Sequence, residues 1–523
     1  KVYAAYKEAV ETKDRPVLIL AKTVKGYGMG AAGEGKMIAH QQKKLDAKDL
    51  QAFRDRFDLP ISDAEIDSVP FRKPPEDSPE IRYLKERRAA LGGYLPRRID
   101  KAPPLTIPPI DEIFKGQLEG TGDREISTTM AMVRMLTALC RDKEIGRHVV
   151  PIVPDEARTF GMDGMFRQFG IWSREGQLYT PQDADTLSYY KEDKTGQILQ
   201  LGIDEAGALC AWNAAGTAYA NHGVQMVPFY LFYSMFGFQR VGDFIWAAGD
   251  SQARGFLIGG TAGRTTLAGE GLQHQDGHSH LLSSTVPNCR SYDPAYACEL
   301  AVIVHDGLQR MFERQERMFY YITCMNENYV QPALPEGARE GILKGMYELR
   351  NAGQPKKGRQ RVQLLGSGTI LREVIAAADL LAEKYGVDAD LWSVTSFNEL
   401  RRDALSVTRR NRLHPAKRPE QSYVEQCLAG RKGPFVAATD YMCAIPDQVR
   451  EWVPGRYVTL GTDGYGRSDG RAALRDHFEV DRRYVAAAAL AALAADGSLE
   501  AKVAAAAIKD LGIDPDKPDP VEL

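Results

Sequence analysis

Apolar residues along this chain fall in short runs that alternate with longer amphipathic segments. Helical spacing over residues 128–141 leads into the apolar run 148–153. A short apolar run beside a helix is typical of a parallel-sheet strand, because such strands are buried on both faces. The pattern repeats as a strand over 197–202, a helix over 206–220 and a strand over 224–232. This alternation predicts an α/β fold built on parallel sheets.

The first 110 residues predict one more α/β layer and then less regular structure. Residues 2–11 have helical spacing, and the apolar run 16–21 predicts a buried strand after that helix. Five glycines between residues 26 and 35 favour a mobile loop. Nine prolines within residues 70–110 predict an extended linker. We therefore expect a domain boundary in this linker.

The strand and helix pattern restarts after about residue 335. A strand over 362–365, a helix over 369–385 and a strand over 390–394 predict a separate βαβ domain. The turn at 366–368 has two glycines, which serve either an anion at the helix start or only a tight connection. The predicted domains are residues 1–69, the linker 70–110, and two further domains over 111–335 and 336–523.

Composition narrows the class of protein. The chain has 523 residues, 44% hydrophobic, with a net charge of −3, so no general attraction to nucleic acid or membranes is expected. Seven scattered cysteines without a C-x-x-C pair suit reduced thiols, and no apolar run is long enough to span a bilayer. We expect a cytoplasmic protein. Because the chain starts with Lys1 in what looks like the middle of an α/β unit, we also expect a fragment of a longer protein.

A glycine-rich loop over residues 269–280 has the composition of a functional site. It holds three of the nine histidines, His274, His278 and His280. Imidazole titrates near neutral pH and also binds metals, so the loop suits a proton-handling centre, a metal site, or merely solvated histidines. Gly277 and the lack of an H-E-x-x-H pattern argue against a zinc-binding helix.

Two other features carry candidate chemistry. Asp155, Glu156 and Glu205 follow predicted strands, at the sheet edge where ligands of parallel sheets bind. A glutamate at a helix start, such as Glu205, is most often a helix-dipole or capping residue, and the spacing does not exclude that role here. Aromatic residues crowd the segment 229–240, either as core or as a stacking surface for a flat heteroaromatic cofactor.

At these positions the chain resembles a known family. The segments that carry the resemblance are TVKGYGMG, IVPDEARTFGM, GQILQLGIDEAGA, FYSMFGFQR and RTTLAGEGLQHQDGHSH. They are similar to the homodimeric bacterial pyruvate dehydrogenase component, the thiamine-diphosphate-dependent decarboxylating subunit of its complex. The resemblance extends to YVTLGTDGYGRSDGRAALRDHFEV near the C-terminus. It implies consecutive parallel-sheet domains of the transketolase-like thiamine-diphosphate type.

The resemblance also implies roles for residues around the cofactor. Glu205 matches the glutamate that hydrogen-bonds N1′ of the aminopyrimidine ring, where a carboxyl favours the tautomer that removes the thiazolium C2 proton. Phe236 matches the residue that stacks on this ring, with Tyr233 and Arg240 nearby. Asp155 and Glu156 resemble acids near the reacting centre.

Histidines are implied on the substrate side. His274 matches a pocket histidine that faces pyruvate, and no metal ligand is expected in this chain. His40 matches the residue for transfer to the lipoyl group, on a loop expected to order when an intermediate is present. Lys25 and Lys43 either stabilise that closed loop or are ordinary solvated lysines. His278 and His280 are expected to support their own loop.

The implied reaction is oxidative decarboxylation of pyruvate, with release of CO₂ and transfer of the acetyl group to the lipoyl domain of dihydrolipoyl acetyltransferase. The implied cofactors are thiamine diphosphate and Mg²⁺, and the implied state is a homodimer. The family's Gly-Asp-Gly motif for diphosphate and Mg²⁺ is absent from these 523 residues. We expect it in a preceding segment, without which the fragment is inactive. Two alternatives are another thiamine enzyme, such as a transketolase, and a non-catalytic scaffold that lacks the diphosphate domain.

Overall fold

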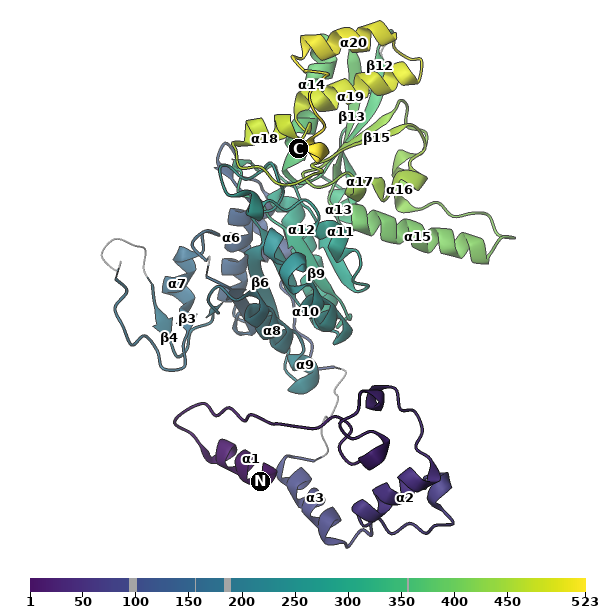
Figure 1. Ribbon diagram of the computed structural model, residues 1–523. Coiled ribbons are helices and arrows are strands. Elements are labelled where there is room, and N and C mark those ends of the chain that lie inside the picture. Colours follow the sequence, from purple (N-terminus) through teal and green to yellow (C-terminus); the bar gives the residue numbers. More distant parts are fainter. Residues whose placement is uncertain (94–100, 156, 183–189, 355–356) are drawn as a thin grey trace. The chain divides into compact units, whose positions relative to one another are not determined.

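The computed structural model describes residues 1–93, 101–155, 157–182, 190–354 and 357–523 (Figure 1). The chain divides into two compact units, Lys1–Arg97 and Arg98–Leu523. In the part of the chain that is described, no helix has the length and apolar character needed to cross a bilayer.

The first unit is helical in its described residues. It contains α1 (Val2–Glu11), as predicted, α2 (Ala47–Arg56) and α3 (Pro79–Ala90). The buried strand predicted over 16–21 is wrong: this segment has no regular structure, and Leu18 and Leu20 are exposed. A buried strand needs neighbouring strands to bond with, and the described residues of this unit form none.

The Pro-rich segment is not extended throughout, which corrects the linker prediction. Helix α3 lies inside it, and the Ser78 hydroxyl accepts a hydrogen bond from the backbone N–H of Ile81 to cap the helix. Pro79 occupies the first turn, where a missing N–H costs nothing and a fixed φ favours the helix. The prediction from proline content therefore missed the start of a helix.

A six-stranded parallel sheet forms the centre of the second unit. Its strands are β2 (Val149–Val153), β5 (Leu199–Gln200), β6 (Val227–Tyr233), β7 (Phe256–Gly260), β8 (Cys289–Tyr292) and β9 (Phe319–Thr323), in the order β5-β2-β6-β7-β9-β8. All neighbouring pairs are parallel, as the apolar runs predicted. The strand predicted over 197–202 is shortened to two residues at the sheet edge.

Helices cover both faces of this sheet. Strand β6 shows why: Phe229 and Leu231 point into the core under α6 (Thr128–Arg141) and α12 (Ala297–Leu308). Tyr230 and Phe232 point into the core under α8 (Glu205–Gly216) and α10 (Phe238–Asp250). Because both faces are buried, the strand is apolar at every position.

A second sheet is formed by the C-terminal part of the chain. Its strands are β11 (Met346–Arg350), β12 (Gln360–Gly366), β13 (Val387–Val394), β14 (Phe435–Ala438) and β15 (Tyr457–Leu460), in the order β11-β13-β12-β14-β15, and only β11 is antiparallel to its neighbour. Helices α14 (Leu371–Lys384) and α19 (Arg482–Ala495) pack on one face, while α15 (Phe397–Leu413) and α16 (Tyr423–Leu428) pack on the other. In Figure 1 the end of α15 projects away from the sheet.

Shorter elements complete the fold. The remaining helices are α4 (Ile110–Ile113), α5 (Lys115–Leu118), α7 (Asp163–Phe169), α9 (Ala218–Asn221), α11 (Ser279–Ser283), α13 (Ala338–Lys344), α17 (Ala444–Asp447), α18 (Arg471–His477) and α20 (Ala501–Asp510). Two small sheets pair β1 (Glu125–Ile126) with β10 (Tyr329–Val330) and β3 (Ile171–Trp172) with β4 (Glu192–Asp193). The helix predicted over 206–220 is divided into α8 and α9 at Thr217.

Candidate active site

Glu205 is the first residue of α8, immediately after the edge strand β5 and its turn. The Asp204 side chain caps the helix by accepting a hydrogen bond from Gly207 N–H at 2.9 Å. A Cβ at position 207 would collide with the Asp204 carboxylate, so glycine lets the cap close. The Glu205 side chain is 12% exposed, and its Oε1 lies 2.9 Å from Nη1 of Arg240. The helix start therefore holds one sheltered carboxylate beside a cation.

Arg240 also covers an aromatic ring. Its guanidinium carbon lies 3.8 Å from the centre of the Phe236 ring, a stacked cation–π contact. Phe236 ends the 3₁₀ turn Ser234–Phe236 that joins β6 to α10. Tyr233, the last residue of β6, contacts Phe236 edge-on at 5.7 Å between ring centres. Four residues predicted for the cofactor pocket therefore form one continuous cluster.

His274 joins this cluster from the glycine-rich loop. Its ring centre lies 5.0 Å from that of Tyr233 and 5.2 Å from that of Phe236. Its Nδ1 atom is buried and has no hydrogen-bond partner among the residues that the structure describes. A buried ring nitrogen without a partner is costly unless a ligand supplies one. The loop forms a 3₁₀ turn (Leu272–His274) and not a continuous helix, as Gly277 predicted.

The loop is fastened by the C-terminal sheet domain, which sequence reasoning missed. Asp440, after β14, accepts hydrogen bonds from the side chains of Thr265 and Thr266, both at 2.7 Å. Burial raises the pKa of Asp440 above its usual value, and these hydrogen bonds oppose that effect. Further along, Gly269 N–H donates to the Asp469 carbonyl. Asp469 belongs to the segment YVTLGTDGYGRSDG. In the sequence, only the resemblance of this segment to the family pointed to it.

The other two histidines of the loop lie deeper in the protein. His280 is buried with Nε2 3.0 Å from the Thr323 hydroxyl, and burial lowers its pKa to about 4. His278 is half-buried, and desolvation lowers its pKa, an effect that the nearby Asp276 opposes. Both imidazoles are therefore favoured in the neutral form.

The remaining predicted residues are not gathered into this cluster by any described contact. Asp155 is exposed and accepts a hydrogen bond from Gln200 at 3.2 Å. Glu156 lies outside the described residues. His40 ends the 3₁₀ turn Met37–His40 in the first unit, where it is exposed together with Lys25 and Lys43.

The loop that carries His40 is folded on itself, and its mobility stays a prediction. Glu34 accepts a hydrogen bond from Gly28 N–H and pairs with Arg56 of α2, and this pairing lowers the pKa of Glu34. The backbone of Gly35 returns to donate to the Lys25 carbonyl at 2.8 Å. These hydrogen bonds close the loop on itself and attach it to α2.

Sequence reasoning also missed Phe160 as a neighbour of this cluster. Its ring lies 5.6 Å from the Tyr233 ring and packs where a Cβ on Gly260 would lie. It stands in IVPDEARTFGM, so the motif was visible but the aromatic contact was not.

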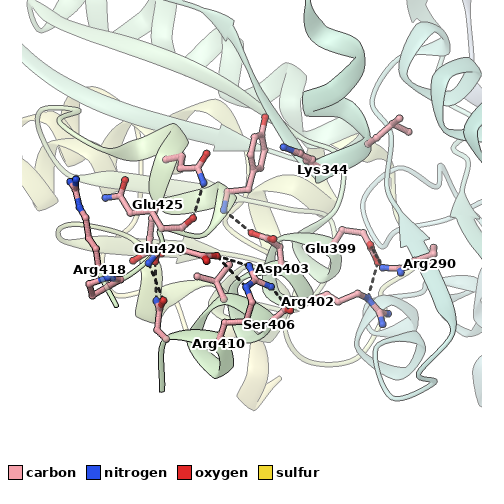
Figure 2. A pocket seen from close by; sticks show the side chains of 17 residues that line it. Arg290, Lys344, Glu399, Arg402, Asp403, Ser406, Arg410, Arg418, Glu420 and Glu425 are labelled. Carbon is pink, nitrogen blue, oxygen red and sulfur yellow. Dashed lines mark hydrogen bonds and ion pairs between the residues drawn. The ribbon is translucent and has the colours of Figure 1, made fainter. Parts of the chain in front are cut away.

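A large hollow lies elsewhere, between α15, α16 and α13 (Figure 2). It has a volume of about 1040 Å³, and charged side chains line it. Its cations are mostly neutralised from within: Arg290 pairs with Glu399 at 2.6 Å and Arg410 with Glu420 at 3.1 Å. None of the predicted site residues that the structure describes lines it.

Comparisons with known proteins identify the family. Residues 105–332 match the pyruvate dehydrogenase E1 component middle domain, and residues 345–481 match the transketolase-like C-terminal domain. The pyruvate dehydrogenase E1 component of Pseudomonas aeruginosa is 62% identical over 523 residues, which is 100% of this chain. The chain belongs to the pyruvate dehydrogenase E1 component family. The resemblance found in the sequence is thereby confirmed.

Other pyruvate dehydrogenase E1 components show the same relationship. The Escherichia coli protein is 55% identical over 99% of this chain, and the Cupriavidus necator protein is 56% identical over 100%. The chain spans 58–59% of the length of these relatives.

Solved structures confirm the predicted fold class of this pyruvate dehydrogenase E1 family member. Transketolase of Pichia stipitis matches with a TM-score of 0.61 at 16% identity, over 95% of this chain and 66% of that one. Transketolase of Campylobacter jejuni matches with a TM-score of 0.58 at 15% identity, over 93% and 64%. At such identities the likeness concerns the fold.

Proposed function

We propose that this chain supplies part of the active site of a pyruvate dehydrogenase that uses thiamine diphosphate and Mg²⁺. The enzyme would be an oxidoreductase that acts on an oxo group with a disulfide acceptor, releases CO₂ from pyruvate and passes the acetyl group to the lipoyl domain of dihydrolipoyl acetyltransferase. The observation that carries the proposal is the cluster of Glu205, Arg240, Phe236, Tyr233 and His274 in a chain of this family.

The described residues fit the pyrimidine end of this cofactor. A sheltered carboxylate at Glu205 suits a ring nitrogen, and an aromatic face at Phe236 suits a flat ring. When bound, the cofactor supplies a carbon acid that becomes the nucleophile toward pyruvate. The diphosphate and the metal would be held by residues beyond this chain, since the Gly-Asp-Gly motif does not occur in it.

Arg240 gives this pocket a resident partner. Its guanidinium lies on the face of Phe236 and on the carboxylate of Glu205, the two groups assigned to the pyrimidine ring. A cofactor ring that used the same face of Phe236 or the same oxygen of Glu205 would compete with Arg240 for it. In the absence of the cofactor, the arginine gives the sheltered carboxylate and the aromatic face a partner.

His274 would act on the substrate. Its unpartnered Nδ1 is available to hydrogen-bond an oxygen of pyruvate as negative charge develops there. Asp155 and Glu156 remain proposed neighbours of the reacting centre. His40 would supply the proton that the departing lipoyl sulfur needs in the second half of the reaction.

The proposed setting is a cytoplasmic homodimer within a multienzyme complex. All seven cysteines are free thiols, which suits a reducing compartment. The name of the relatives, an E1 component, supports assembly with an acyltransferase component.

The test is a pair of activity measurements on the full-length protein with thiamine diphosphate and Mg²⁺. We expect CO₂ release from pyruvate, and acetylation of an isolated lipoyl domain in equal amount. Ketol transfer between sugar phosphates without pyruvate turnover would favour a transketolase instead. Activity in neither assay would favour the non-catalytic scaffold.

A further inference from the structure

A small pocket lies on the second unit, lined by residues of α5, β1, α6, α12, the loop between α5 and β1, and the residue after β10. Its volume is about 100 Å³. Its lining consists of Gly116, Gln117, Gly120, Thr121, Arg124, Ile126, Arg134, Ala297 and Gln331. No residue of the candidate active site is among them.

Two arginines face this pocket. Arg134 stands in the middle of α6, and Arg124 lies just before β1. In the described part of the chain, neither guanidinium has a carboxylate within ion-pair distance, although the hollow of Figure 2 pairs most of its own cations. Burial and the charge of Arg124 both lower the pKa of Arg134, so the two cations repel each other. Like charges held at one pocket favour an anionic ligand.

The pocket is rigidly built. The side-chain amide of Gln331 donates to the Ile126 carbonyl at 2.7 Å and accepts from Ala297 N–H at 2.9 Å. These two bonds hold the amide in place as part of the pocket wall. The Thr121 hydroxyl accepts from Gln331 N–H at 3.0 Å. Gly120 has φ of +79°, and a Cβ there would collide with the backbone of residues 331–333. This close approach fixes the loop that carries Arg124.

We propose that this pocket binds a small tetrahedral oxyanion, inorganic phosphate or the phosphate group of a larger molecule, through the guanidinium groups of Arg124 and Arg134. The size suits an anion of five heavy atoms. Arginine presents planar pairs of N–H donors that match phosphate oxygens. The site goes beyond the proposed function and does not depend on it.

Calorimetric titration of inorganic phosphate into the full-length protein tests the site. We expect Arg134→Gln to weaken binding about tenfold or more, because charge-assisted hydrogen bonds are lost. Arg134→Lys keeps the charge but loses the paired donors, so we expect an intermediate affinity. Arg141→Gln is the matched control: Arg141 lies on the same helix and bonds to Gln168, away from the pocket.

Thermal unfolding separates lost binding from lost folding. Phosphate should raise the Tm of the wild type and of Arg141→Gln, but not that of Arg134→Gln. In phosphate-free buffer Arg124→Gln should unfold at or above the wild-type Tm, because it relieves the repulsion between the two arginines. A clearly lower Tm for Arg124→Gln there would overturn the argument from uncompensated charge.

A nucleoside monophosphate, titrated in parallel, distinguishes the two sources of the anion. Tighter binding of inorganic phosphate would assign the site to the free ion, and tighter binding of the nucleotide to the phosphate group of a larger molecule. In both cases the affinity should depend on Arg134. The proposal is overturned if Arg134→Gln binds both ligands as the wild type does, or if Arg141→Gln loses as much affinity.

Discussion

Single side chains of the candidate site are explained by what surrounds them. Glu205 looks from sequence like a capping residue, but Asp204 performs the capping and leaves the Glu205 carboxylate to Arg240. His274 differs from the two other loop histidines because its ring nitrogen is buried without a partner. The structure thus distinguishes residues of the same type by their contacts.

The role proposed for Glu205 predicts the result of removing its charge. Glu205→Gln should slow hydrogen–deuterium exchange at the cofactor's C2 by about 10²–10⁴-fold, the range of general acid–base catalysis, while cofactor binding changes less. The measurement is NMR-monitored exchange in the loaded full-length enzyme. Glu112→Gln, at an exposed position of α4, is the control. Unchanged exchange in Glu205→Gln would contradict the assignment.

Helices and loops position these side chains. Two of these elements, helix α8 and the loop that carries His40, can be tested by mutation. The cap of α8 orients Glu205, and the local hydrogen bonds of residues 26–40 shape the loop that presents His40. Sequence spacing located both elements. It did not show how the loop over residues 26–40 is held, because the Arg56 guanidinium donates to the carboxylate of Glu34, a residue 22 positions away.

Loss of the α8 cap should destabilise the protein. Asp204→Ala removes the hydrogen bond to Gly207 N–H and should lower the free energy of unfolding by about 1 kcal/mol. Asp204→Ser keeps an acceptor and should retain most of that stability. Urea unfolding followed by circular dichroism measures both variants; equal stability of Asp204→Ala and the wild type would show that the cap contributes nothing.

The loop of His40 should matter for acetyl transfer alone. His40→Ala should impair acetylation of the lipoyl domain and spare pyruvate decarboxylation measured with an artificial electron acceptor, because only the former needs a proton for sulfur. His414→Ala, another exposed histidine, provides the comparison. If His40→Ala loses both activities equally, the proposed division of labour is wrong.

The two sheets of the second unit meet through buried polar groups rather than through an apolar seam alone. Asp293 follows β8 of the first sheet, and its carbonyl accepts from Gly368 N–H after β12 of the second. Its carboxylate accepts from Thr323 at 2.7 Å, and Thr323 contacts His280. Burial raises the pKa of Asp293 to about 7, helped by the nearby Asp440 and Glu299.

This buried acid predicts a pH-dependent stability. Because its folded pKa lies above the unfolded value, Asp293 stabilises the fold fully below about pH 4, and this contribution is lost as the pH rises toward 7. Asp293→Asn should therefore be more stable than the wild type at pH 8, by about 4 kcal/mol at most, and similar to it at pH 4.

Denaturant unfolding at the two pH values checks this prediction. The difference between the two proteins reports the titration of Asp293 together with its influence on the nearby acids Asp440 and Glu299. A difference in stability that is the same at pH 4 and pH 8 would exclude titration of Asp293 as its cause.

Sequence alone established the parallel α/β fold, the helix over 128–141 and the family, because strands buried on both faces must be apolar and long motifs survive in order. It also named Glu205, Phe236 and His274. Only the tertiary structure showed that residues 16–21 are not a strand and that a helix starts at Pro79. It also showed that Asp440 binds Thr266, just before the glycine-rich loop. The missing strand and the Asp440 contact depend on residues distant in the sequence, and the helix start depends on a single cap. None of these causes produces a periodic pattern of hydrophobic residues.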